Sequence, residues 1–151
     1  MTSVKKSRPP VGATGGPAPA GYSGTPLPKK LGIKPGSVVR ILGAPKGFRK
    51  TLGALPEEVE LREDSRGRAN LTLWFLPSLE VLERGMQAMA ASLEEGKIWM
   101  IWPKKASGMA TDLSEQEVRE AGLAAGLVDY KVCAVDATWS GLLFTRRKGK
   151  Q

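Results

Sequence analysis

The sequence contains no histidine and only one cysteine, Cys133. The missing histidine excludes Ser-His and Cys-His catalytic pairs and an imidazole base, and a zinc site built from Cys and His side chains is excluded with them. A single cysteine also excludes an internal disulfide. Any catalysis would depend on carboxylates, lysine, tyrosine or a bound cofactor, and the residues predict no cofactor and no metal.

Long apolar runs are also missing. No stretch approaches the ~20 apolar residues that a membrane-spanning helix needs, and the basic start of the chain is not followed by the apolar core of a signal peptide. We therefore predict a cytoplasmic protein without a membrane segment. With 151 residues, of which 41% are hydrophobic, the chain suits one domain with a true core.

Acidic residues are missing from the first third of the chain. Residues 1–50 hold ten of the 23 Lys and Arg residues and none of the 15 Asp and Glu residues, which leaves 13 bases for the remainder. Basic ends can bind nucleic acid by neutralising phosphates. They are also common as plain solubilising ends, and we favour that interpretation because no aromatic residues are interleaved with these bases.

Composition divides the chain into three parts. Residues 1–21 are basic and rich in Pro, Gly and Ala, and such a stretch buries too little surface to offset its chain entropy, so we expect a disordered tail. Residues 22–147 are predicted to form a single α/β domain. Residues 148–151 form a basic C-terminal end.

Short runs of β-branched and aromatic residues that stop at Gly or Pro predict the strands, which are placed at 38–42, 59–62, 70–76, 97–102, 128–136 and 142–147. Helical spacing of apolar residues predicts a turn at 29–31, a short helix from Phe48 to Leu55 and a long helix over 78–95, with Ser78 as N-cap and Gly96 after its end. A last helix is predicted to begin at Asp112, with an acid at its third position, and to stop at Gly126.

Alternating strands and helices predict a three-layer α/β sandwich, in which a mostly parallel sheet is covered on both faces and ends in an antiparallel hairpin. Turns before the apolar strands, at 31–39 and 93–99, and the final helix and hairpin resemble the Rossmann-like sheet of S-adenosylmethionine-dependent methyltransferases, with one β-α unit fewer.

Several stretches resemble a bacterial family known as domain of unknown function 3052. They are GYSGTPL (21–27), KKLGIKPG (29–36), WPKKASG (102–108), TDL (111–113), GLVDYKVCAVD (126–136) and WSGL (139–142). This resemblance implies no activity, and no catalytic residue is carried over from it.

Open α/β sheets bind ligands beyond the carboxyl ends of their strands. Gly43 and Gly47 follow a predicted strand, and Glu63 comes 20 residues after Gly43, as a ribose-binding acid does in nucleotide-binding folds. Pro45 and Phe48, however, stand where the second and third glycines of G-x-G-x-x-G belong. We therefore favour an ordinary strand-to-helix turn, with nucleotide or S-adenosylmethionine-like binding as the alternative.

A second loop joins the fourth predicted strand to the last helix. Lys104 and Lys105 offer ammonium groups, Ser107 and Thr111 offer hydroxyls, and Gly108 lies near the free N–H groups of a helix start. These residues would suit a small anion such as phosphate or carboxylate. The alternatives are a solvated lysine pair and a capping aspartate that competes for the same N–H groups.

For two further residues we favour a packing role over a functional one. Trp139, expected in the hairpin tip at 136–141, is a possible partner contact but more often folds back over the sheet. Cys133 lies within a strand and is expected to be buried rather than reactive.

The leading hypothesis is a non-catalytic binding or adaptor domain on a methyltransferase-like scaffold, with a protein or a small anionic ligand as partner. The alternatives are a small-molecule enzyme or sensor that uses the strand-end loops, and nucleic-acid binding through the basic tails.

Overall fold

The computed structural model describes residues 26–64, 68–93, 96–105 and 111–146. The predicted tail (1–21) and the predicted basic end (148–151) lie outside these residues. Within them, no helix is both long and apolar enough to cross a bilayer.

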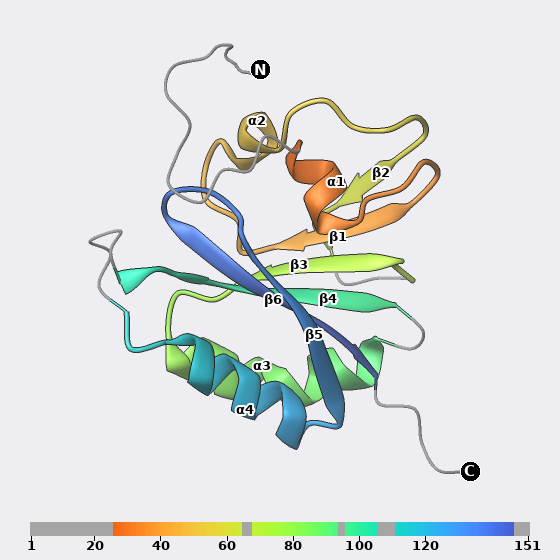
Figure 1. Cartoon of the computed structure of the whole chain (residues 1–151). Helices are drawn as coiled ribbons and strands as arrows, with labels where there is room; N and C mark the ends of the chain where they lie inside the picture. Colours follow the sequence, from red (N-terminus) through yellow and green to blue (C-terminus); the bar gives the residue numbers. More distant parts are fainter. Residues whose placement is uncertain (1–25, 65–67, 94–95, 106–110, 147–151) are drawn as a thin grey trace.

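Six strands form one sheet in the order β2-β1-β3-β4-β6-β5 (Figure 1). The bounds are β1 Val38–Leu42, β2 Glu60–Arg62, β3 Leu71–Phe75, β4 Lys97–Pro103, β5 Leu127–Ala134 and β6 Trp139–Arg146. Strands β1 to β4 pair in parallel, whereas β6 pairs antiparallel with both β4 and β5. The predicted mostly parallel sheet with a terminal antiparallel hairpin is therefore confirmed.

Helices cover both faces of the sheet, as the three-layer prediction requires. Helices α1 (Leu27–Leu31) and α2 (Phe48–Leu52) lie on one face, and α3 (Leu79–Ser92) and α4 (Glu115–Ala124) lie on the other (Figure 1). Each layer buries its own hydrophobic cluster against the sheet.

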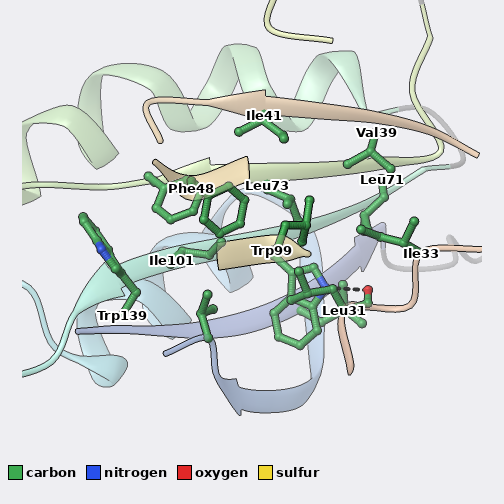
Figure 2. Close-up of a cluster of buried hydrophobic side chains, with 14 residues drawn as sticks. Leu31, Ile33, Val39, Ile41, Phe48, Leu71, Leu73, Trp99, Ile101 and Trp139 are labelled. Atoms are coloured by element: carbon green, nitrogen blue, oxygen red, sulfur yellow. Dashed lines mark hydrogen bonds between the residues drawn. The ribbon is translucent and has the colours of Figure 1, made fainter. Parts of the chain in front are cut away.

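Successive side chains of β4 point to opposite faces of the sheet, so this strand contributes residues to both hydrophobic clusters. Trp99 and Ile101 join the cluster under α1 and α2, whereas Ile98 and Met100 join the cluster under α3 and α4. The Trp99 indole N–H also donates a buried 2.9 Å hydrogen bond to the Leu31 carbonyl, which attaches α1 to the middle of the sheet (Figure 2).

The predicted start of the last helix was wrong. α4 begins at Glu115, and Ser114 is its N-cap in a capping box with Glu117. Asp112 serves a different helix, because its Oδ1 atom accepts a 2.7 Å hydrogen bond from the Leu79 backbone N–H at the start of α3. A carboxylate can cap any helix whose free N–H groups it meets in the folded chain. Asp112 therefore caps α3, although it is closer to α4 in the sequence.

Two helix ends also differ from the prediction. The predicted cap Ser78 is confirmed, but α3 ends at Ser92 with Leu93 as C-cap, before Gly96. Gly96 has a different role, since a Cβ atom there would lie 2.6 Å from the Ala69 carbonyl oxygen. α2 ends at Leu52, before Leu55.

The hairpin connection is shorter than predicted, since β5 ends at Ala134 and β6 begins at Trp139. Trp139, expected in the tip, is the first residue of β6 and is only 7% exposed. The favoured interpretation, in which this indole folds onto the sheet, is confirmed.

Candidate functional site

The residues predicted for the first candidate site meet at the carboxyl edge of the parallel strands. Gly43 follows β1 and Glu63 follows β2, and these strands are parallel neighbours. Both residues line one surface pocket of about 430 Å³, together with Gly47 and Arg49. The structure thus brings Gly43, Gly47 and Glu63 together.

The glycine at position 43 is required by the fold itself. Its φ angle is +73°, and an added Cβ atom would lie 2.9 Å from the Phe75 carbonyl oxygen at the end of β3. Gly47 also has a positive φ, +85°, but a Cβ atom there would meet nothing within 4 Å. Close approach of two strand ends therefore explains Gly43 without a ligand.

Glu63 already has a cationic neighbour. Its carboxylate lies 3.2 Å from the Arg49 guanidinium of α2, and both side chains are more than half exposed. Exposed pairs of this kind contribute little, ~0–1 kcal/mol, so a ligand could displace Arg49 at small cost. In this structure, however, the carboxylate of Glu63, which is the acid at the ribose-binding position, is paired with Arg49.

Three aromatic side chains pack together beside this pocket, and the sequence analysis missed them as a group. Phe75, at the end of β3, contacts Phe48 with ring centroids 4.8 Å apart and Trp139 with centroids 5.2 Å apart, both edge-to-face. All three rings are buried, with exposures of 1–7%. Figure 2 shows Phe48 and Trp139 on the same side of the cluster.

The aromatic contact has a consequence for ligand binding. Phe48 begins α2, Phe75 ends β3 and Trp139 begins β6, so the three rings extend the buried α1/α2 cluster as far as the carboxyl ends of the central strands. Open α/β sheets place ligands there. No local pattern connects these residues, and only the departure of Phe48 from the glycine motif hinted at the arrangement.

The second predicted loop is described only at its ends. Lys104 is half-buried and its backbone N–H donates to the Thr138 carbonyl (2.8 Å), whereas Lys105 is exposed. The Thr111 hydroxyl donates to the Pro77 carbonyl (3.3 Å) and accepts from the Leu113 N–H (3.1 Å). Two further predicted contacts, Ser107 and Gly108, lie outside the described residues. Backbone groups thus already engage the hydroxyl predicted to hold an anion.

Cys133 is half-buried and packs against the α1/α2 cluster. Burial raises the pKa of its thiol, and Lys30, Lys131 and Lys104 act in the opposite sense without reversing that effect. The thiol is therefore protonated at neutral pH and a poor nucleophile, as an inert packing residue should be. No group of three or more His, Cys, Asp or Glu side chains suited to a metal ion occurs in the part of the chain that the structure describes.

Solved structures with a similar fold are methyltransferases and Rossmann-type proteins. A putative type 11 methyltransferase from Sulfolobus solfataricus is 13% identical, with a TM-score of 0.55 over 83% of this chain and 92% of that one. An S-adenosylmethionine-dependent methyltransferase from Aquifex aeolicus is 14% identical, with a TM-score of 0.53 over 77% and 85%. A protein of the NADB-Rossmann superfamily from Streptococcus agalactiae is 6% identical, with a TM-score of 0.54 over 84% and 70%.

These likenesses establish a methyltransferase-like fold and nothing further. No curated protein matches the sequence. The family model described as "Protein of unknown function (DUF3052)" matches residues 28–148. Since that match covers most of the 151 residues and the whole described sheet, the chain belongs to the DUF3052 family.

Proposed function

We propose that the protein is a non-catalytic binding or adaptor domain that retains a methyltransferase-like sheet. The observation that carries the proposal is the contact of Phe48 with Phe75, which itself contacts Trp139, because it makes Phe48 a core residue at the position where a nucleotide-binding motif needs its third glycine. The Arg49–Glu63 pair supports it further, because the acid suited to a ribose has a protein partner. A fold alone does not supply a reaction.

Titration calorimetry with S-adenosylmethionine, NAD and ATP tests this proposal. We expect no binding heat, because Pro45 and Phe48 replace two glycines of the nucleotide-binding motif and Glu63 is paired with Arg49. Micromolar binding of any of the three would contradict the proposal. Native mass spectrometry of the purified protein gives an independent check, and a co-purifying nucleotide would also count against it.

A small-molecule sensor or enzyme is the second candidate, favoured by one observation. Gly43, Gly47 and Glu63 line a single pocket of about 430 Å³, which is within the usual size range of small-molecule sites. If this candidate is correct, a nucleoside ligand will bind, and Glu63→Gln will weaken it at least tenfold. Glu60→Gln, at an exposed position at the opposite end of β2, is the matched control.

An anion site near Lys104 and Lys105 remains a separate hypothesis. Its support is the pair of lysines that begins the loop between β4 and α4. Phosphate titration of the wild type and of the Lys104→Ala/Lys105→Ala variant tests it. Equal affinities would remove both lysines from any such site.

A further inference from the structure

Charge is divided between the two helical layers of the sandwich. Helices α1 and α2 contain four bases and no acid, whereas α3 and α4 contain five acids and two bases. The two layers lie on opposite faces of the sheet (Figure 1). The helices of one layer therefore carry a net positive charge and those of the other layer a net negative charge.

Four ammonium groups of the basic face point to solvent. Lys29, Lys34, Lys46 and Lys50 are all exposed, and no ion pair or side-chain hydrogen bond engages them within the described part of the chain. We call these four residues the basic layer. Their positive charge is therefore available to an external anion.

Two other bases of the same helices have structural partners. The Lys30 Nζ atom donates a 2.9 Å hydrogen bond to the Ala134 carbonyl. Arg49 pairs with Glu63 at 3.2 Å. Lys30 and Arg49 therefore have partners within the protein, whereas the four lysines of the basic layer have none among the described residues.

Two lysines of the basic layer line the same groove. Lys29 and Lys34 line a groove of about 520 Å³ together with Leu55, which follows α2. The chain that leads into α1, residues 1–25, adds three more bases and no acid.

We propose that the basic layer binds the phosphate backbone of a nucleic acid duplex. Exposed lysines gathered on and beside two helices that contain no acid are the expected electrostatic footprint of such a protein. A single strand suits this face less well, because single-strand sites stack bases on exposed aromatic rings. Phe48, the aromatic residue of the two helices, is only 3% exposed. Lys46 also lines the pocket at the carboxyl edge of the sheet, whereas Lys29, Lys34 and Lys50 do not, so the inference rests on these three lysines whether or not that edge takes a ligand.

Salt dependence gives the sharpest test. The full chain is titrated onto a short fluorescent DNA duplex in about 50 to 200 mM salt, and binding is followed by anisotropy. Four phosphate contacts predict a slope of log K against log salt of about −4, since each contact contributes about −0.9. A slope near zero, or no binding at the lowest salt, would overturn the proposal.

A pair of double variants locates the contact. Lys29→Gln/Lys50→Gln should make the slope shallower by about 2 and weaken binding about tenfold. Arg84→Gln/Lys97→Gln removes the same net charge from exposed positions outside the basic layer and should change neither quantity appreciably. Circular dichroism verifies that both variants are folded. Equal losses in the two variants would assign binding to net charge alone and overturn the proposal.

Two further binding measurements identify which polyanion the basic layer prefers. An RNA duplex of the same sequence shares the phosphodiester backbone, so similar affinities for the two duplexes support backbone binding, and a preference for one names the natural partner. Vesicles containing phosphatidylserine present anionic charge without a duplex. Tighter binding to these vesicles than to either duplex would contradict the assignment to nucleic acid.

Discussion

At the scale of single residues, Gly43 connects the candidate pocket to the core. Replacing it with alanine forces a side chain into a positive-φ conformation, which costs about 1 to 3 kcal/mol, and places Cβ 2.9 Å from the Phe75 carbonyl oxygen. We therefore expect a large loss in the free energy of unfolding, measured with urea. Gly47→Ala is the matched control, because it has the same backbone strain but open space around Cβ. Equal losses would show that the contact with Phe75 is unimportant.

Glu117 gives a pH-dependent prediction at the same scale. Its carboxylate accepts a 2.8 Å hydrogen bond from the Ser114 backbone N–H and another from the Ser114 hydroxyl. The hydroxyl bond is the main cause that lowers the pKa of Glu117, and the charge of Lys105 acts in the same direction. The folded pKa is therefore below the unfolded value of about 4.3. The resulting stability is complete above that value and is lost as the pH falls through the folded pKa.

Urea unfolding of the wild type and of Glu117→Gln checks this sign. The wild type should be the more stable at neutral pH, and the difference should shrink below about pH 4 as the carboxylate is protonated. Glu120→Gln removes an acid from the same helix without touching the capping box, and serves as the control. A difference between wild type and Glu117→Gln that stays constant, or that grows in acid, would contradict the assignment.

At the scale of elements, the start of α3 depends on a residue from a distant part of the chain. Asp112 accepts a hydrogen bond from Leu79 N–H, while Ser78 accepts one from Val81 N–H. Asp112→Ala should lower the free energy of unfolding by about 0.5 to 2 kcal/mol, as the loss of a helix cap does. Asp112→Asn keeps the acceptor oxygen and should lose clearly less. If both variants lose the same amount, the hydrogen bond does not stabilise α3.

The same aspartate explains why element boundaries were harder to predict than the elements themselves. Apolar periodicity located β1, β3, β4 and α3 within a few residues, because one buried face leaves a regular local pattern. Caps and hairpin ends depend on which groups meet after folding. Asp112 follows a capping pattern for α4 and yet caps α3, and Trp139 lies near a turn pattern and yet begins β6.

The candidate site also has one part that was predictable from the sequence and one part that was not. The meeting of Gly43 and Glu63 was predictable, since parallel neighbouring strands bring their carboxyl ends to one edge. The packing of Phe48, Phe75 and Trp139 was not, because three elements far apart in the sequence supply the rings and each one alone resembles an ordinary core residue. These rings bear most strongly on whether the edge binds a ligand.

At the scale of the whole molecule, the sheet couples two hydrophobic clusters into one cooperative unit. Neighbouring residues of a strand point to opposite faces, so neither cluster can form unless the strands that both share are already paired. Ile41 of β1 is buried in the α1/α2 cluster, and Ile98 of β4 is buried in the α3/α4 cluster. Unfolding of one layer should therefore bring about unfolding of the other.

Conservative substitutions on the two faces test this coupling. Ile41→Val and Ile98→Val should each lower the free energy of unfolding by about 0.5 to 1.5 kcal/mol, and the double variant should lose the sum within about 0.5 kcal/mol, because the two side chains pack in different clusters. Tryptophan fluorescence and far-ultraviolet circular dichroism should give the same urea midpoint in every variant. Trp99 and Trp139 report on one cluster, and Trp74 and Trp102 on the other. A fluorescence transition that splits in two would mean that one helical layer can detach while the sheet persists.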